Sequence, residues 1–327
     1  MIIITGGAGF IGSALVWQLN KLGITDILIV DELGQDEKWK NLVNLKFADY
    51  VEKYQFLDDI IDGKYKNQKI EQIFHMGACS STQEQDASYL IENNFEYTKI
   101  LAEYCLANQI QFVYASSAAT YGDGNKGYSD KSIDGLKPLN MYGYSKQLFD
   151  QYATNKGYFA DGKNKIVGIK FFNVYGPNEN HKDDMKSMVN KAYQQIKKDG
   201  KIGLFKSYKP EFADGEQKRD FIYVKDAAEI VLAFSRKYVS GIFNVGTGKA
   251  HSWNELARAI FKAMDVPAKI DYIEMPEILQ GKYQYFTEAE MEKTLAIIGG
   301  HKFYSLEDAV ADYVKNYLAK AVYLGGE

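Results

Sequence analysis

The stretch Thr5-Gly6-Gly7-Ala8-Gly9-Phe10-Ile11-Gly12 decides the fold of this chain. It follows an apolar run and precedes residues with helical spacing, so it joins a predicted strand to a predicted helix. At such a junction Gly6 permits the tight turn, Gly9 lets the backbone approach a pyrophosphate, and Gly12 lets helix and strand pack closely. Asp31 ends the next apolar run, about 20 residues downstream, where an acid that binds a ribose is expected. The stretch therefore predicts a dinucleotide-binding unit.

Short apolar runs alternate with longer segments of helical spacing over the first half of the chain. The runs suit strands that are buried on both faces, and they cover residues 2–5, 27–31, 70–75, 112–116 and 166–172. A chain that repeats strand, helix and strand builds a parallel, doubly wound sheet with right-handed crossovers. We therefore expect an α/β fold in which a doubly wound, parallel-sheet Rossmann domain is joined by a smaller mixed α/β substrate lobe.

The pattern changes after Phe172. A further apolar run at 242–245 is followed by Gly246-Thr247-Gly248, Ser252 and Glu255 have the spacing of a capping box, and residues 270–273 look like a strand. A length of 327 residues exceeds what one core usually fills. We expect residues 1–172 plus 220–248 to form the dinucleotide-binding domain, and residues 173–219 plus 249–327 to form the substrate domain.

The composition argues against several classes of protein. A net charge of −4 argues against nucleic acid and anionic membranes as partners, and two cysteines are too few for a disulfide scaffold. No run of about 18 apolar residues and no secretory leader is present, so we expect a cytoplasmic protein. The four histidines lack metal-ligand spacing, and we expect no metal.

A second motif, Tyr142-Gly143-Tyr144-Ser145-Lys146, suggests the chemistry. If Tyr142 begins a helix, Lys146 lies one turn along on the same face, where its ammonium favours the phenolate of Tyr142. Lys146 can also bind the ribose of a nicotinamide cofactor. Ser117 ends a predicted strand at the sheet edge where ligands bind, and its hydroxyl can contact the hydroxyl or carbonyl that reacts.

The form of the cofactor stays open at this point. The carboxylate of Asp31 binds a free 2′-hydroxyl and repels a 2′-phosphate, which favours NAD. Lys38 and Lys53 lie downstream of the second predicted strand, and two lysines placed over the ribose would offset that repulsion and favour NADP. The residues are consistent with both dinucleotides.

Longer stretches resemble one family. The glycine motif, Ser117 and the Tyr142–Lys146 spacing are similar to the extended short-chain dehydrogenase/reductase superfamily, and more narrowly the chain resembles the ADP-L-glycero-D-manno-heptose 6-epimerase family. The resemblance spans nearly the whole chain and rests on residues 5–12, 75–82, 114–122, 138–146, 172–177, 181–182 and 219–224. Its most specific marks are HMGACSST at 75–82 and YASSAATYG at 114–122.

The resemblance implies an epimerase that supplies heptose for the lipopolysaccharide core. Members of the family oxidise C6 of the heptose in ADP-D-glycero-D-manno-heptose with bound NADP and return the hydride to the other face of the ketone. Chemistry on two faces of one carbon needs a proton-transfer group on each. The resemblance implies Tyr142 and Lys182 as the two catalytic groups, with Ser117 and Lys146 beside Tyr142.

The glycine motif and the resemblance together imply a set of binding residues. The cofactor set is Gly6, Gly9, Phe10, Ile11, Gly12, Asp31, Glu32, Lys38, Lys53, Met76, Gly77, Ala78, Cys79, Ser80, Asn93, Lys146, Val174 and Lys182. The substrate set is Ser117, Asn173, Asp184, Lys191, Phe205, Arg219 and Tyr283. Within the family, the lysines at 38 and 53 favour one tightly bound NADP per subunit over NAD. Glu32, Asp184 and Lys191 depart from the residues usual in the family.

The resemblance also implies a homo-oligomer, a homopentamer, with ADP-heptose as its small-molecule partner. A UDP-sugar 4-epimerase or another nucleotide-sugar-modifying enzyme of the same fold is the alternative. A dehydratase of this fold places Thr-Asp-Glu where this chain has Ser117-Ala118-Ala119, and a non-catalytic dinucleotide sensor is expected to have lost Tyr142 or Lys146. Both of those residues are present.

Overall fold

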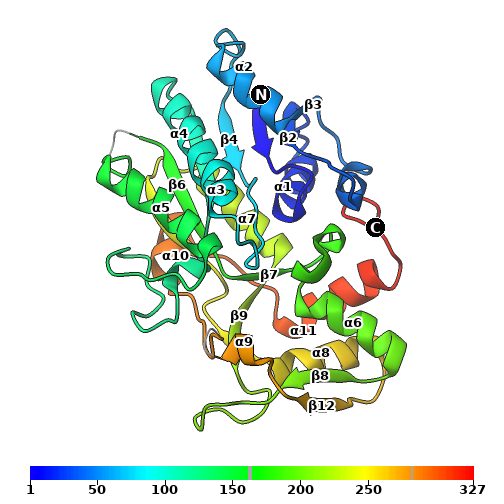
Figure 1. Cartoon of the computed structure of the whole chain (residues 1–327). Helices are drawn as coiled ribbons and strands as arrows, with labels where there is room; N and C mark the ends of the chain where they lie inside the picture. Colours follow the sequence, from blue (N-terminus) through cyan, green and yellow to red (C-terminus); the bar gives the residue numbers. More distant parts are fainter. Residues whose placement is uncertain (161–163, 281–282) are drawn as a thin grey trace.

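A seven-stranded parallel sheet dominates the computed structural model, which describes residues 1–160, 164–280 and 283–327 (Figure 1). Within these residues the strand order is β10-β6-β5-β4-β1-β2-β3, and every neighbouring pair is parallel. The strands are β1 (Ile2–Thr5), β2 (Ile27–Asp31), β3 (Asp49–Glu52), β4 (Gln72–His75), β5 (Gln111–Ser117), β6 (Ile166–Phe171) and β10 (Gly241–Val245). The expectation of a doubly wound α/β fold is confirmed.

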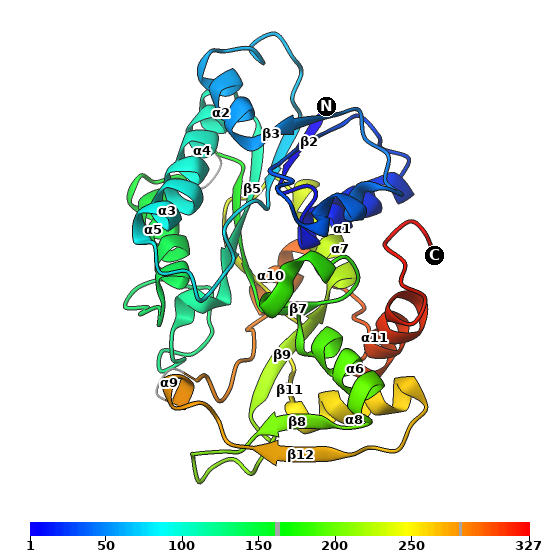
Figure 2. The same cartoon turned by 45° about the vertical axis from the view of Figure 1, so that its right-hand side comes forward.

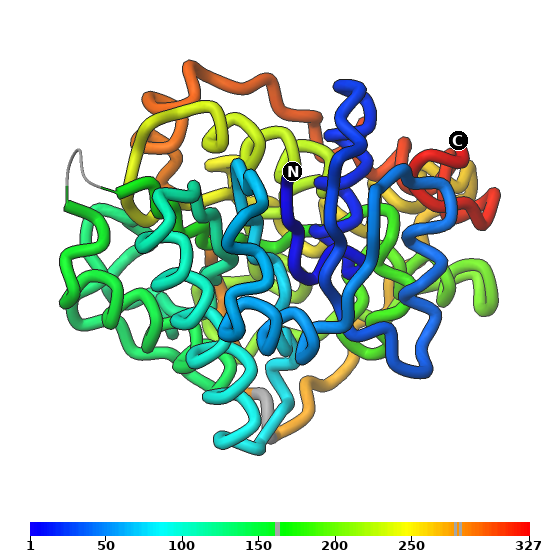
Figure 3. The backbone as a smooth tube through the Cα atoms, turned by 90° about the horizontal axis from the view of Figure 1, so that it is seen from above, coloured from blue at the N-terminus to red at the C-terminus, as the bar shows by residue number. Residues whose placement is uncertain are grey.

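Helices cover both faces of this sheet. The helices α1 (Phe10–Lys21) and α7 (Val224–Ser235) pack against each other on one face. The other face carries α2 (Lys53–Ile61), α3 (Ala87–Leu90), η2 (Ile91–Glu96), α4 (Tyr97–Ala107) and α5 (Met141–Asn155). Seen from above in Figure 3, the cyan and green segments lie on one side of the molecule and the yellow segment of α7 lies on the other.

Side chains of successive strand residues pack into two separate hydrophobic cores, one on each face of the sheet, which explains why the strands are apolar throughout. Ile2 and Ile4 of β1 pack in the core under α1 and α7, whereas Ile3 packs in the core under α2, α4 and α5. Side chains alternate along a strand, so a strand covered on both faces needs apolar residues at every position. The runs predicted at 2–5 and 27–31 coincide with β1 and β2.

Two small sheets lie beyond the large sheet in Figure 2, and the pair of β8 and β12 lies at the end of the molecule opposite the N-terminus. The first has the order β11-β9-β7, and the second pairs β12 with β8. Their strands are β7 (Asn173–Tyr175), β8 (Ile202–Phe205), β9 (Lys218–Tyr223), β11 (Ala250–Ser252) and β12 (Ile270–Ile273). The strand expected at 270–273 is β12, and the capping box of Ser252 and Glu255 begins α8 as expected.

The remaining helices of the second half are α6 (Met188–Asp199), α8 (Trp253–Met264), α9 (Glu277–Gln280), α10 (Glu292–Ile298), α11 (Leu306–Asp312) and η5 (Tyr313–Leu318). α6 and α8 pack against the small sheets and α11 packs against α8, whereas α10 packs against β10 and α7. The short helical segments η1 (Glu37–Leu42), η3 (Ala118–Tyr121) and η4 (Asn180–Met185) lie in connections. No helix in the described ranges is both long enough and apolar enough to cross a bilayer.

Three short junctions in the described residues connect the large sheet directly to the strands of the small sheets, and the chain crosses again where α10, on the large sheet, is followed by α11. β6 is followed almost at once by β7, and β9 runs directly into α7. Residues 246–249 join β10 to β11. The residues next to these three junctions therefore lie between the large sheet and the small sheets.

Candidate active site

The glycine motif forms a turn that only glycine fits at two positions. Gly6 has φ +65°, and a Cβ added there would lie 2.5 Å from the backbone N of Gly77. A Cβ on Gly12 would lie 2.0 Å from the carbonyl oxygen of Gly6. The first clash would block the approach of the loop after β4, and the second would push α1 away from the turn. The turn therefore leaves backbone exposed at the start of α1, which suits a pyrophosphate.

A cavity of about 130 Å³ lies at the outer end of this turn. Its lining includes two acids and two lysines, which form two ion pairs. Lys38 Nζ lies 3.1 Å from Asp31 Oδ1, and Lys53 Nζ lies 2.6 Å from Glu32 Oε2. Burial opposes the charge of Lys53, but Glu32 keeps its pKa raised. The four residues expected around the adenosine ribose thus lie together.

The carboxylate of Asp31 accepts hydrogen bonds from the protein backbone in addition to its ion pair with Lys38. Its Oδ2 accepts from Ala8 N at 2.9 Å and its Oδ1 accepts from Glu32 N at 2.8 Å. Asp31 is buried, whereas the side chain of Glu32 is 52% exposed. Glu32 can therefore turn toward solvent if its ion pair with Lys53 opens, whereas Asp31 cannot.

A second cavity of about 570 Å³ adjoins the first and holds most of the expected site residues. The two cavities share several lining residues, among them Gly6, Asp31 and Gly77. Every residue expected to contact the cofactor lines one or both of them. The second cavity also contains Ser117, Tyr142 and Asn173. Residues from distant parts of the sequence thus surround one continuous space.

Tyr142 lies in the first turn of α5, as the sequence predicts. Asn140 begins the helix, because its Oδ1 accepts from Gly143 N at 2.8 Å. Lys146 lies one turn further on, and its Nζ donates to Ala115 O at 2.8 Å. Ser117 ends β5, and its hydroxyl accepts from Ala119 N at 3.1 Å. The expected group of Ser117, Tyr142 and Lys146 is therefore present in one cavity.

The electrostatics of this group differ from the expectation in one respect. Burial raises the pKa of Tyr142, and a hydrogen bond from Ser117 opposes that rise. Burial also lowers the pKa of Lys146 to about 8. The expected help of Lys146 to the Tyr142 phenolate is absent from the causes that act on Tyr142 here, because the ammonium is turned to the Ala115 carbonyl. Tyr142 is thus protonated at neutral pH in this state.

Lys182 reaches the same cavity from η4. Its Nζ lies 5.5 Å from the centre of the Phe10 ring, over the start of α1. Burial lowers the pKa of Lys182, and the nearby carboxylate of Glu179 opposes that shift. In Figure 1, α5 lies at the left and the short green segment that follows β7 lies at the right. Tyr142 and Lys182 thus enter the cavity from separate elements.

The backbone next to Lys182 is strained. Asp183 has φ 42° and ψ −120°, a region that glycine favours. Asp183 lines the cavity with an exposed side chain. Its conformation turns the chain directly after Lys182, so the strain occurs where Lys182 must be oriented.

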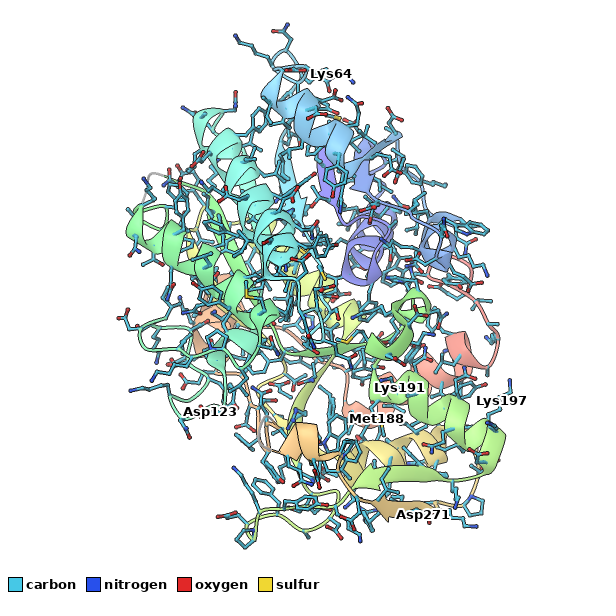
Figure 4. The ribbon with its side chains drawn as sticks, viewed as in Figure 1. Lys64, Asp123, Met188, Lys191, Lys197 and Asp271 are labelled. Atoms are coloured by element: carbon cyan, nitrogen blue, oxygen red, sulfur yellow. The ribbon has the colours of Figure 1, made fainter. Side chains whose placement is uncertain are left out.

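The expected substrate residues separate into two groups. Ser117 and Asn173 line the large cavity, and Asn173 and Lys191 line a third cavity of about 320 Å³. Figure 4 labels Met188 and Lys191, which belong to the lining of this third cavity, at one end of α6 and Lys197 at the other end. Asp184 is exposed outside all three cavities, and its carbonyl oxygen accepts from Lys191 Nζ. Lys191 and Asp184 are therefore neighbours.

Phe205, Arg219 and Tyr283 form an aromatic cluster beside the third cavity, but none of them lines the cavities described above. The Arg219 guanidinium lies 5.1 Å from the centre of the Tyr283 ring and 5.7 Å from that of Trp253. Tyr283 accepts from Trp253 Nε1 at 2.8 Å and packs edge-on against Phe205. Trp253 itself lines the third cavity, so the cluster adjoins it.

Some cavity residues were not expected from the sequence. Trp253 directly follows Ser252 of the capping box, and His181 directly precedes Lys182. Each is therefore next to a residue that the sequence pattern did indicate. His181 Nδ1 lies 3.2 Å from Asn41 Nδ2, and burial lowers the pKa of His181 to about 4. Asp36 precedes η1 and lines the large cavity. In the described ranges, no group of three or more His, Cys, Asp and Glu side chains has the arrangement of a metal site.

Comparisons with known proteins show which proteins this chain is similar to. Residues 2–246 match the model of the family described as "NAD dependent epimerase/dehydratase family". A curated ADP-L-glycero-D-manno-heptose-6-epimerase from Nitratidesulfovibrio vulgaris (strain DP4) is 53% identical over 324 residues, which cover 98% of this chain and 99% of that protein. A protein of the same name from Fusobacterium nucleatum subsp. nucleatum is 49% identical over 331 residues, 98% of each chain.

Solved structures give the same picture. The crystal structure of Helicobacter pylori ADP-L-glycero-D-manno-heptose-6-epimerase has a TM-score of 0.82 and 26% identity, covering 97% of this chain and 96% of that chain. The UDP-glucose 4-epimerase of Thermus thermophilus, solved in complex with NAD, has a TM-score of 0.76 at 24% identity and covers 98% and 99%. The second likeness shows the fold alone.

Proposed function

We propose that this protein interconverts ADP-D-glycero-β-D-manno-heptose and ADP-L-glycero-β-D-manno-heptose. The chain belongs to the NAD-dependent epimerase/dehydratase family and, within it, to the ADP-L-glycero-D-manno-heptose-6-epimerases. The observation that carries this proposal is the common cavity of Tyr142 and Lys182. An epimerase must move a proton on each face of one carbon, and this cavity offers one titratable group from each of two elements.

The roles of the two groups follow from their charges. Tyr142 is protonated at neutral pH, so it donates its proton to the C6 oxygen when the hydride is returned to the ketone. Lys182 has a lowered pKa, so a larger fraction of it is the neutral amine, which takes the proton of the C6 hydroxyl on the opposite face when that carbon is oxidised. Ser117 holds the reacting oxygen beside Tyr142. The dinucleotide, when bound, takes up the hydride and returns it.

The cofactor is a nicotinamide dinucleotide, in keeping with the family. We propose NADP. A 2′-phosphate would find Lys38 and Lys53 in one small cavity, each paired now with an acid that a dianion can replace. Glu32 can turn to solvent, which reduces the repulsion that it would exert on the phosphate. Denaturing the purified protein and identifying the released nucleotide tests this proposal, and NAD alone would contradict it.

The substrate is proposed to bind on the far side of the large cavity. Asn173 and Ser117 line that cavity and suit the sugar, whereas Arg219 is the cation that suits the diphosphate. Tyr283 lies against Arg219 and Phe205 packs on Tyr283, so the two residues offer rings to the nucleotide. We assign residues 173–219 and 249–327 to substrate binding and residues 1–172 and 220–248 to cofactor binding. We also propose a homo-oligomer, which light scattering on the purified protein tests.

The decisive experiment offers two substrates separately. ADP-D-glycero-D-manno-heptose and UDP-galactose are each incubated with the protein, and the configuration of the sugar is followed by proton NMR. We expect inversion at C6 of the heptose and no change in the galactose. Conversion of only the UDP-sugar would contradict the proposal and favour a UDP-sugar 4-epimerase. Because the cofactor is regenerated in each cycle, the nicotinamide absorbance should show no net change.

A further inference from the structure

A fully buried ion pair lies behind the proposed catalytic group and takes no direct part in the reaction. Lys170 of β6 and Asp150 of α5 are both 0% exposed, and Lys170 Nζ lies 2.7 Å from Asp150 Oδ2. Taking both charges out of water is unfavourable, and apolar residues of the same size often serve a core at least as well. A charged pair at this position therefore needs a reason other than packing.

Asp150 and Lys146 lie one turn apart on α5, and both form hydrogen bonds with residues 114–116 of β5. Lys146 Nζ donates to the carbonyl of Ala115 at 2.8 Å. Asp150 accepts from the hydroxyls of Tyr114 and Ser116, the residues on either side of Ala115, at 2.8 Å each. The ammonium and the carboxylate are thus held against three consecutive residues of one strand. Figure 2 shows α5 beside the sheet that contains β5.

Lys170 connects the same carboxylate to the turn after Ser117. Its Nζ donates to Thr120 Oγ1 at 2.6 Å, and the Thr120 hydroxyl donates to Ser117 O at 2.7 Å. Asp150 consequently has one cation in direct contact, Lys170, and a second cation one helical turn away, Lys146. The carboxylate is shared between the two.

The other groups around Lys146 cannot replace Asp150. His75 of β4 is neutral, because burial lowers its pKa to about 3. Tyr142, on α5, stays protonated at neutral pH because burial raises its pKa, and Cys79, in the loop after β4, carries a thiol rather than a carboxylate. Burial lowers the pKa of Lys146, and Asp150 is the first of the charges that oppose it. Among the described residues that act on Lys146, Asp150 is thus the carboxylate that supplies a negative charge.

We propose that Asp150 is a positioning residue whose carboxylate keeps the Lys146 amine in its ammonium form beside Tyr142, and that Lys170 limits this effect by sharing the carboxylate. The inference rests on the proposed function, in which Tyr142 exchanges a proton with the substrate in the cavity that it shares with Lys146. Asp150 itself touches neither substrate nor cofactor.

The first test measures the titration of Lys146 directly. The protein is labelled with carbon-13 at the lysine Cε, the signal of Lys146 is identified by its absence from Lys146→Met, and its chemical shift is followed against pH. We expect Asp150→Asn to lower the midpoint by about one unit or more, since a buried counter-charge is lost. We expect Lys170→Met to raise the midpoint, since a neighbouring cation is lost. A purely structural pair would not shift the midpoint in opposite directions.

A second comparison does not depend on the stability of Asp150→Asn, which leaves Lys170 buried without a partner. The double variant Asp150→Asn with Lys170→Met removes both charges and keeps an amide whose oxygen accepts from one of the Tyr114 and Ser116 hydroxyls and whose NH2 group can donate to the other. Its Lys146 midpoint should lie below that of Lys170→Met alone, because the two differ only in the carboxylate. Equal midpoints in these two proteins would overturn the proposal.

The pH profile of epimerisation provides an independent readout. The loss of activity at high pH should move in the same order as the Lys146 midpoints. Glu103→Gln is the matched control, because Glu103 binds α5 from the exposed side, through the Tyr152 hydroxyl at 2.6 Å, and should shift neither readout. A protein that does not epimerise the ADP-heptose would contradict the proposed function, while the order of the NMR midpoints would still decide the role of Asp150.

Discussion

Asp183→Gly should stabilise the protein, because it removes strain from the turn beside Lys182. The backbone of Asp183, with φ 42° and ψ −120°, matches the first central position of a type II′ turn, where glycine is preferred. Non-glycine residues held in such regions cost about 1–3 kcal/mol. The side chain is exposed, and in the described residues it makes no hydrogen bond that the change would remove.

The expected gain is smaller than the strain. Glycine also gives the unfolded chain more freedom, which costs about 0.5–1 kcal/mol, so the net gain in the free energy of unfolding is about 0.5–2 kcal/mol. For 327 residues at about 2.1 cal/mol/K each, the entropy of unfolding is about 0.7 kcal/mol/K. The gain therefore corresponds to a rise in Tm of about 1–3 °C.

Calorimetry on cofactor-free protein measures this rise, because a bound ligand would add its own stabilisation. The matched control is Asp184→Gly, since Asp184 is the exposed neighbour and has a negative φ. Asp184→Gly should lower Tm, because it adds freedom to the unfolded chain and relieves no strain. If Asp183→Gly lowers Tm as much as the control does, the reasoning about strain is wrong.

Three other predictions use different parts of the structure. Tyr142→Phe and Lys182→Met should each lose at least about 100-fold in epimerisation activity while retaining bound cofactor. Tyr144→Phe, on the exposed side of α5, is the control. Full activity in Tyr142→Phe or in Lys182→Met would remove that residue from the mechanism. Asp220→Asn should lower the free energy of unfolding by about 3 kcal/mol in urea titrations, because the buried carboxylate accepts from Thr247 N and Oγ1, Gly248 N and Ala289 N, and an amide can satisfy only part of this set. His75 should make the free energy of unfolding fall by about 1.4 kcal/mol per pH unit as the pH drops from about 6.5 toward 4. The pKa of His75 is lowered to about 3 in the folded protein, so only the unfolded state takes up the proton in this pH range. His75→Gln should reduce this slope, and an unchanged slope would contradict it.

The fold could be predicted wherever burial on both faces left a continuous apolar run. β1 and β2 were located to the residue for that reason. β3 was missed, because Asp49–Glu52 is a polar, partly exposed edge strand whose sequence does not differ from that of a loop. The alternation of strands and helices fixed the sheet, whereas the pairing of β7, β9 and β11 depends on contacts between distant residues that no local pattern predicts.

The candidate site was predictable where a motif is local. The glycine turn and the Tyr142–Lys146 spacing depend on neighbours within one turn or one helix, so the sequence contains them completely. The pairing of Lys38 with Asp31 and of Lys53 with Glu32 required the folded chain. The pairing of Lys170 with Asp150 also lay beyond sequence reasoning, because a lysine in an apolar strand does not reveal which carboxylate it meets.

The three short junctions between the large sheet and the small sheets restrict how the molecule can be divided. A single connection would act as a swivel, whereas connections at β6–β7, β9–α7 and β10–β11 fasten one part to the other along a common seam. Several connections restrict the relative movement of the two parts more than one connection would. Exchanging residues 173–219 and 249–327, which we propose bind the substrate, with those of a relative requires three recombination points, because they do not form one contiguous fragment.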